Sequence, residues 1–299
     1  MTDGAASEKA PENANGRWVV ETLYEKEGFT CAFRADRVLY EEETGQQHLV
    51  IFENGLFGRM MALDGITQVT ERDEFIYHEM MTHVPILAHG NAKRVLIIGG
   101  GDGGILREVL RHESVEHVTM VEIDPAVTDF CKQQLPRISA GAFGDPRLDL
   151  VFADGAKFVE ETPASYDVVI VDSTDPIGPG EVLFREEFYR AAKARLTPGG
   201  VIVTQNGVPF MQGDELAATM EKFRRLFKVA SCYLATIPTY VGGPMAMGWG
   251  TDDETLKSIS LEELEKRFEK AGLVTRYYTP EVHKAAFALP RYVRDCIEP

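Results

Sequence analysis

Residues 94–104 read RVLIIGGGDGG, and this stretch decides the fold. Its apolar half, residues 95–98, is typical of a strand that is buried on both faces of a sheet. The run of glycines that follows predicts a sharp turn into a helix, because glycine lets the backbone turn tightly and approach a ligand closely. A strand, a glycine-rich turn and a helix in this order form a common nucleotide-binding arrangement.

The residues within and after this loop indicate what it binds. Gly99, Gly101 and Gly104 have the spacing G-x-G-x-x-G, and Glu122 ends the next predicted strand, near the offset expected of a ribose-binding acid. Asp102 places a carboxylate inside the loop, where the pyrophosphate of a dinucleotide would lie. Two anions at close range repel each other. The loop therefore favours an adenosyl sulfonium over NAD.

Further β-prone runs alternate with helix-length segments after this loop. They are residues 118–122, 148–152, 167–171 and 201–204. The alternation predicts an α/β fold, with a mostly parallel sheet covered by helices on both faces. We expect residues 71–299 to form this Rossmann-like catalytic domain, with one helix at 260–271. Another helix is predicted to begin with a cap at Thr70 and to end near Pro85.

The preceding segment, residues 17–70, has a different pattern. Short β-prone runs at 37–40, 47–52 and 59–63 are separated by the turn signals Thr44-Gly45, Asn54-Gly55 and Asp64-Gly65. They predict a small N-terminal domain of antiparallel β-hairpins. Residues 1–16 are small and polar without an apolar core, which predicts a disordered tail rather than a signal peptide.

Composition narrows the classes of partner. Among 299 residues, 47 are acidic and 31 are basic, a formal charge of −16 that disfavours nucleic acid and anionic membrane surfaces. No apolar run approaches the ~18 residues of a membrane span. Four scattered cysteines without a CxxC pair predict neither a metal site nor a disulfide framework, and they fit a reducing cytoplasm.

Acidic residues follow two further predicted strands. Asp154-Gly155 is either an ordinary Asp-Gly turn or an acceptor for the amine of adenine. Asp172 ends the strand at 167–171, and Asp175 follows in a loop rich in proline and glycine. Ligands of parallel sheets bind beyond the carboxyl ends of the strands, so these two carboxylates would form a wall that binds a cation. The alternative is that they only form turns and helix caps.

Taken together, the motifs resemble the polyamine aminopropyltransferase (spermidine synthase) family. The resemblance covers nearly everything from Trp18 onward. The stretches that carry it are GGGDGG (99–104), VEID (121–124), DG (154–155), DSTDP (172–176), ERDEFIYHEM (71–80) and IPTYVGG (237–243). The resemblance implies a small N-terminal β domain that is followed in the chain by a methyltransferase-like Rossmann domain. This sequence departs from some members of the family at Val241, where they carry a second tyrosine after the one that matches Tyr240.

The resemblance also implies a role for each matching residue. Asp172 resembles the general base that receives the proton of the attacking amine. The residues implied for the cosubstrate are Gln47 and Asp102 at its terminal amine, Glu122 at the ribose, Asp154 at the adenine amine, and Gly99, Gly101, Gly155 and Pro179 along the adenosine pocket. The residues implied for the diamine are Tyr77, His78, Asp172, Asp175 and Tyr240.

The activity implied is transfer of an aminopropyl group from decarboxylated S-adenosylmethionine to a diamine, with putrescine expected. Neither a permanently bound cofactor nor a metal is expected, and the chain would form a homodimer or homotetramer. Three alternatives share features of the sequence: an amine N-methyltransferase, a nicotinamide-dependent dehydrogenase and a catalytically silent polyamine-binding protein. Asp102 argues against the first two, and the intact acids argue against the third.

Overall fold

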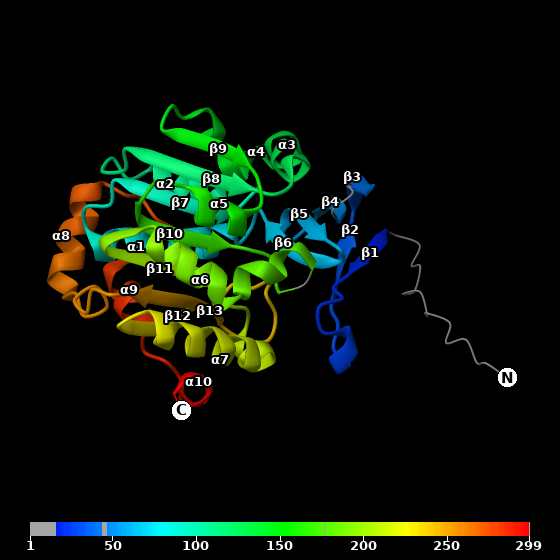
Figure 1. The fold of residues 1–299 in the computed structure, drawn as a ribbon. Helices are drawn as coiled ribbons and strands as arrows, with labels where there is room; N and C mark the ends of the chain where they lie inside the picture. Colours follow the sequence, from blue (N-terminus) through cyan, green and yellow to red (C-terminus); the bar gives the residue numbers. More distant parts are fainter. Residues whose placement is uncertain (1–15, 44–46, 177, 299) are drawn as a thin grey trace. The chain divides into compact units, whose positions relative to one another are not determined.

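The computed structural model describes residues 16–43, 47–176 and 178–298. It divides the chain into two compact units, residues 1–72 and residues 73–299 (Figure 1). The predicted tail lies outside the described residues, except for its last residue, Gly16. The predicted turn at Thr44-Gly45 also lies outside them. The α/β class predicted from the sequence is confirmed by the sheets of the two units.

The first unit consists of antiparallel strands. β1 (Arg17–Val20) pairs with β2 (Ala32–Ala35), and a second sheet joins its four strands in chain order. That sheet contains β3 (Arg37–Glu43), β4 (His48–Asn54), β5 (Gly58–Leu63) and β6 (Ile66–Thr70). Asp64 and Gly65 join β5 to β6 with φ angles of 50° and 76°, and such positive φ angles suit the tight turns of hairpins. The unit also contains the short helix η1 (Glu25–Glu27) and a core of Val19, Ala35, Val50, Phe52, Met60 and Ala62.

The second unit is built on a seven-stranded sheet in the order β12-β13-β11-β10-β7-β8-β9. The five strands from β11 to β9 are parallel, and β13 and β12 extend the sheet antiparallel at the other edge. The strands are β7 (Arg94–Gly99), β8 (His117–Glu122), β9 (Leu148–Phe152), β10 (Tyr166–Asp172), β11 (Leu196–Gln205), β12 (Val229–Ala235) and β13 (Met245–Thr251). The four strands predicted downstream of the glycine loop all form, with boundaries that differ by a few residues.

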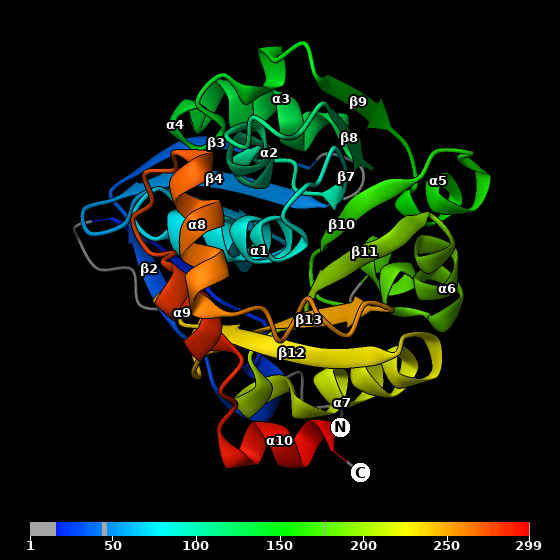
Figure 2. The same cartoon turned by 90° about the vertical axis from the view of Figure 1, so that its left-hand side faces the viewer.

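Helices cover both faces of this sheet (Figure 2). On one face pack α1 (Glu74–His89), α2 (Gly104–Leu110), α8 (Leu261–Ala271) and α9 (Pro280–Ala286). On the other face pack α5 (Gly155–Glu161), α6 (Glu186–Ala194), α7 (Pro209–Leu226) and α10 (Arg291–Ile297). The remaining helices are α3 (Pro125–Gln134), α4 (Pro136–Ser139), η2 (Ala142–Gly144) and η3 (Gly178–Phe184). Successive side chains of β7 enter opposite cores, which explains why this strand is apolar throughout.

Both predicted ends of the helix near residues 70–85 are wrong. Thr70 is the last residue of β6, and α1 begins at Glu74. The helix continues through Pro85 and ends before Gly90, whose φ of 79° suits glycine. A proline inside a helix removes one backbone hydrogen bond. The last turns of α1 are buried against the sheet, and we attribute the continuation of the helix to this burial.

Candidate active site

The candidate site lies at the point where the strand order of the sheet reverses. From β7 the chain proceeds through β8 to β9 on one side, and it then returns to β10 on the other side of β7. Ligands of open parallel sheets bind outside the carboxyl ends of the strands at such a point. The last residues of these two central strands, Gly99 and Asp172, are direct partners in the ladder.

The glycine loop is shaped by its close approach to Asp172 and Glu122. Gly99 has a φ of 81°, and a Cβ there would lie 2.0 Å from the backbone oxygen of Asp172. The amide of Gly100 donates to that same oxygen at 3.2 Å. A Cβ on Gly101 would lie 2.8 Å from Oε2 of Glu122. The loop therefore needs glycine at these positions even before a ligand is considered.

Asp172 has a tyrosine as its partner. Tyr77, from the first turn of α1, donates its hydroxyl hydrogen to Oδ1 of Asp172 at 2.6 Å. The ring of Tyr240 stands edge-on to Tyr77, with centroids 6.1 Å apart. Burial and the nearby charge of Asp102 raise the pKa of Asp172 to about 6, although Tyr77 and His78 act in the opposite direction. Asp172 is therefore a stronger base than an ordinary carboxylate and is ionised above neutral pH.

Asp102 and His78 face each other across the loop. Nε2 of His78 lies 3.4 Å from Oδ2 of Asp102, and Oδ1 of Asp102 accepts the amide of Gly104 at 2.7 Å. Burial opposes the charge of Asp102, but His78, the amide of Gly104 and the charge of Arg107 together outweigh it and lower the pKa of this carboxyl group. Asp102 thus presents a negative charge in the loop, as the sulfonium hypothesis requires.

Glu122 ends β8, and Asp154 follows the end of β9 by two residues. Glu122 is buried at the end of β8, and burial raises its pKa to about 7. Asp154 caps α5, where its Oδ1 accepts the amides of Ala156 at 2.8 Å and Lys157 at 3.3 Å. A Cβ on Gly155 would lie 2.6 Å from a methyl group of Ile98, so glycine lets α5 approach β7. The turn-and-cap alternative therefore describes at least part of what Asp154 does.

Asp175 is fixed by two glutamines. Its Oδ1 accepts from Nε2 of Gln212 at 2.7 Å, and the side chain of Gln205 also hydrogen-bonds to it. Gln212 in turn accepts the amide of Val208 at 2.9 Å. Burial raises the pKa of Asp175 above its ordinary value, in spite of these donors. The groups that set its pKa include no cationic side chain, whereas His78 acts on Asp172.

Two predicted residues, Gln47 and Pro179, are not placed in this site. Gln47 belongs to the first unit, immediately before β4, and its predicted role stays a prediction. The side chain of Pro179 lies outside the described residues, although the backbone there forms part of η3. The other predicted residues belong to the second unit, where they lie at or after the ends of β7, β8, β9, β10 and β12 and at the start of α1.

Sequence reasoning missed four side chains that hold the predicted ones: Glu74, Arg107, Gln205 and Gln212. One signal was available, because Glu74 stands four residues before His78 on a predicted helix, and such pairs face each other. No short-range signal was available for the other three. Arg107 reaches Glu74 across 33 positions, and Gln212 reaches Asp175 across 37.

Fold and site together define a Rossmann-type protein whose acidic site suits a nucleoside and a cation. Among the described residues, no group of three or more His, Cys, Asp and Glu side chains is arranged to hold a metal ion. Within the same residues, none of the helices has the length and apolar character needed to span a membrane.

Comparison with known proteins identifies the family. Residues 74–260 match the spermine/spermidine synthase domain, and residues 18–71 match the spermidine synthase tetramerisation domain. The polyamine aminopropyltransferase of Ruegeria sp. (strain TM1040) is 63% identical over 277 residues, which cover 93% of this chain and 97% of the relative. That of Pseudomonas syringae pv. tomato is 59% identical, with coverage of 93% and 96%.

Solved structures agree with the sequence comparison. A spermidine synthase crystallised with the transition-state analogue AdoDATO has a TM-score of 0.89 and 37% identity, covering 97% of this chain and 98% of that one. Spermidine synthase from Thermotoga maritima has a TM-score of 0.86 and 35% identity, with coverage of 97% of each chain. This chain therefore belongs to the spermidine synthase family of polyamine aminopropyltransferases, which are transferases.

Proposed function

We propose that this chain is a spermidine synthase, which transfers an aminopropyl group from decarboxylated S-adenosylmethionine to putrescine and releases 5′-methylthioadenosine. The observation that carries the proposal is the state of Asp172. It is a carboxyl group of raised pKa at the end of β10, in register with the first glycine of the loop and bonded to Tyr77. A base is needed at this place, because the attacking amine must lose a proton.

The reaction is a single displacement. The neutral nitrogen of the diamine attacks the aminopropyl carbon attached to the sulfonium, a C–N bond forms, and the C–S bond breaks. The bonding pair moves to sulfur, which leaves as a neutral thioether, and the proton of the amine passes to Asp172. With a pKa of about 6, Asp172 accepts this proton more readily than an ordinary carboxylate does. Alignment of the two substrates supplies much of the remaining rate.

The donor is assigned to the glycine loop. Glu122 accepts from the ribose hydroxyls, Asp154 from the adenine amine, and Gly99, Gly101, Gly155 and Pro179 line the adenosine. Asp102 receives the terminal ammonium of the aminopropyl group, and its lowered pKa keeps it charged for this role. The parent S-adenosylmethionine carries a carboxylate beside that amine, which Asp102 repels, so the site prefers the decarboxylated donor.

The acceptor is assigned to the other side of Asp172. His78 and the rings of Tyr77 and Tyr240 enclose its methylene groups, and Asp175 binds the distal ammonium. Support comes from the edge-on packing of the two rings and from the two glutamines that fix Asp175. A binding site for an ammonium at a fixed depth selects acceptors by chain length, which makes putrescine the proposed substrate.

The chain is further proposed to act as a homodimer or homotetramer in the cytoplasm. Support for an oligomer is the match of residues 18–71 to a tetramerisation domain. Four free cysteines support a reducing compartment. No metal and no permanently bound cofactor enter the proposed reaction.

The proposal is tested by following products by mass spectrometry. Wild-type protein is given decarboxylated or parent S-adenosylmethionine with putrescine, cadaverine or spermidine, and Asp172→Asn is assayed in parallel. We expect equimolar spermidine and methylthioadenosine from putrescine and the decarboxylated donor. In Asp172→Asn, kcat falls by about 10²- to 10⁴-fold because the base is lost.

Each of the other outcomes would show which part of the proposed function is wrong. Methylthioadenosine formed with another amine, but not with putrescine, would show that the acceptor is misassigned. Full activity in Asp172→Asn would remove this residue as the base. The absence of both products with every donor and amine would overturn the enzymatic proposal and favour a polyamine-binding protein.

A further inference from the structure

The His78 imidazole is almost fully buried. The residue is 2% exposed, Nδ1 lies 2.6 Å from Oε2 of Glu74, and Nε2 lies 3.4 Å from Oδ2 of Asp102. Its ring also packs on the backbone of Gly104, where a Cβ would lie 2.1 Å from Cε1 of the imidazole. The last glycine of the loop is therefore required by this ring. Both ring nitrogens face carboxylate oxygens, and only the imidazolium form donates from both.

The charges around His78 come from several elements. Glu74 and Tyr77 belong to α1, Asp102 to the loop before α2, and Asp172 to the end of β10. Arg107 on α2 approaches through Glu74. Burial opposes a charged imidazole, but Asp102 and Glu74 outweigh it and raise the pKa of His78 to about 10.

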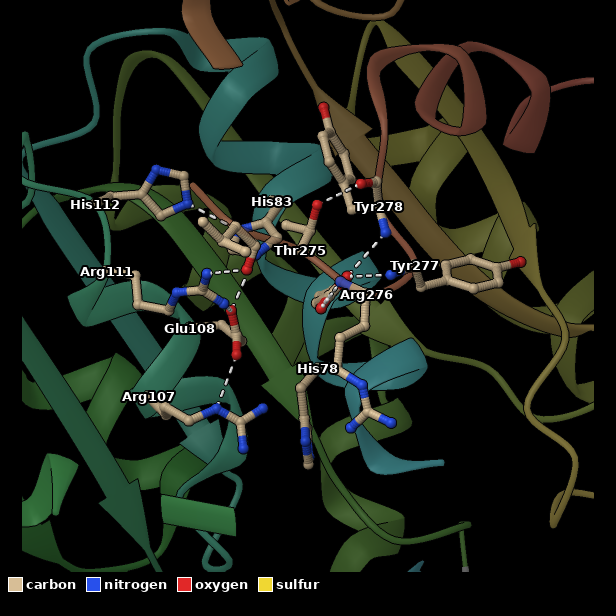
Figure 3. A network of polar contacts seen from close by, with 12 residues as sticks. His78, His83, Arg107, Glu108, Arg111, His112, Thr275, Arg276, Tyr277 and Tyr278 are labelled. Carbon is tan, nitrogen blue, oxygen red and sulfur yellow. Dashed lines mark hydrogen bonds and ion pairs between the residues drawn. The ribbon is translucent and has the colours of Figure 1, made fainter. Parts of the chain in front are cut away.

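Glu74 is itself held from α2. Its Oε2 accepts from Nη2 of Arg107 at 2.9 Å, and its Oε1 accepts from Nη1 at 3.3 Å. Arg107 is fixed in turn by Glu108 at 2.7 Å and by the backbone oxygen of Ile138. Figure 3 shows Arg107 and Glu108 with His78 nearby. The four side chains Asp102, His78, Glu74 and Arg107 thus alternate in charge and link the loop to α2.

We propose that Glu74, anchored by Arg107, is a positioning residue that keeps His78 doubly protonated and turned so that its Nε2–H faces Asp102. The link to catalysis rests on the proposed function, in which Asp102 binds the ammonium of the donor. Without the imidazolium, the Asp102 carboxylate would be buried in the loop with no cationic neighbour in contact. Its charge and its orientation toward the donor would both be lost.

The direct test is the charge of His78 in the full chain without substrates. Long-range ¹H–¹⁵N NMR of histidine-labelled protein distinguishes imidazolium from neutral imidazole, and His78→Gln identifies the signal. We expect wild-type His78 to stay doubly protonated through pH 8. In Glu74→Gln, which keeps the shape but removes the charge, its pKa should fall by about one unit or more.

The matched control is Glu79→Gln on the same helix. Glu79 is also buried, but its oxygens accept the backbone amides of Arg276, Tyr277 and Tyr278, each at 2.8 Å. Its loss should lower stability without moving the titration of His78.

Kinetics give the second readout. Relative to wild type, kcat/KM of Glu74→Gln should fall at least about twofold at pH 9 and by less at pH 7. In Glu79→Gln the ratio should not change with pH.

The outcomes separate this inference from the proposed function. A wild type without turnover would overturn the function, while the NMR titration would still test the role of Glu74. A neutral His78 at pH 7 in wild type, or an unchanged titration in Glu74→Gln, would overturn the inference. If Glu74→Gln does not fold, Arg107→Lys replaces it, since lysine keeps the charge but loses the two-nitrogen contact. An unmoved His78 titration in that variant would equally overturn the inference.

Discussion

Two polar regions lie beside helix α1. Their carboxylates differ in how far nearby cationic groups balance the negative charge. The first, the acidic site, contains Asp102, Glu122, Asp172 and Asp175. The second, the α1–α2 network, contains His83, Arg107, Glu108, Arg111 and His112 (Figure 3). Both regions bury carboxylates beside helices of the same sheet face. They differ in the number of cationic side chains that approach each carboxylate.

Glu108 in the α1–α2 network is surrounded by two arginines and a histidine. Its oxygens lie 2.7 Å from Nε of Arg107 and 2.6 Å from Nη1 of Arg111, and Nε2 of His83 lies 3.0 Å away. These groups outweigh burial and hold the pKa of Glu108 well below its ordinary value. Removing one partner from such a network is destabilising, because it leaves a buried charge without compensation.

In the acidic site, burial instead dominates for three of the four carboxyl groups. It raises the pKa of Asp172 to about 6 and of Glu122 to about 7, and it also raises that of Asp175. Their charges are therefore costly in the folded protein and available to a cationic or hydroxylated ligand. The comparison teaches that the candidate site differs from the α1–α2 network in having few cations paired with its acids, more than in having acids.

The largest expected effect in the comparison is the loss of stability in Glu108→Gln. Removing one partner of a buried ionic network costs about 3–5 kcal/mol. Because the folded-state pKa of Glu108 is lowered, its charge stabilises the protein above the unfolded-state pKa, and this contribution is lost as the pH falls through the folded-state pKa. Denaturant unfolding should therefore show a deficit at pH 7 that narrows toward pH 3.

The control for this variant is Glu116→Gln. Glu116 pairs with Lys93 at 2.8 Å, but its side chain is 68% exposed. Its replacement should change the free energy of unfolding by less than about 0.5 kcal/mol. Equal losses in the two variants would mean that burial and pairing give Glu108 no special weight.

A smaller effect of opposite sign is expected at Glu122. Its folded-state pKa is raised to about 7, so the folded protein loses stability as the pH rises from the unfolded-state pKa through 7. Glu122→Gln removes that loss and should stabilise the substrate-free protein by about 1–3 kcal/mol at pH 8. At pH 5 the two proteins should unfold at nearly the same denaturant concentration. A destabilised variant at pH 8 would contradict the contrast between the two regions.

The smallest effect is expected at Tyr77. Its hydroxyl donates to Asp172 and lowers the pKa of that carboxyl group, so Tyr77→Phe should raise it. A net hydrogen bond of about 0.5–1.5 kcal/mol corresponds to about 0.4–1 pH unit. In the proposed function ionised Asp172 is the active form, so kcat/KM should rise with pH around 6 in wild type. This rise should move to higher pH in the variant.

Tyr233→Phe is the matched control for Tyr77→Phe. Its hydroxyl donates to the backbone oxygen of Met80 at 2.9 Å, so it is also a buried tyrosine bonded next to α1. Replacement should lower stability and leave the pH profile unchanged. If both variants shift the profile equally, or if neither shifts it, then the bond from Tyr77 does not set the pKa of Asp172.

The sequence by itself determined the class of fold and the place of the candidate site. Residues 95–98, the glycines and the alternating runs follow from local rules of burial and backbone freedom, and these rules placed Asp172 at a strand end. Local rules failed at Pro85, where the burial of the last turns of α1 kept the helix intact. They also could not decide the role of Asp154, because the same short pattern fits both a helix cap and an acceptor for a ligand.

Only the tertiary structure decided the electrostatics of the site. The bond from Tyr77 to Asp172 spans 95 positions, and the bond from Arg107 to Glu74 spans 33. The raised pKa of Asp172 depends on burial by elements that are distant in the chain. The fixing of Asp175 by Gln212 likewise requires β10 and α7 to be packed in place. A pattern of residue types records which groups are present, but charge states depend on distances and desolvation, which exist only after the chain has folded.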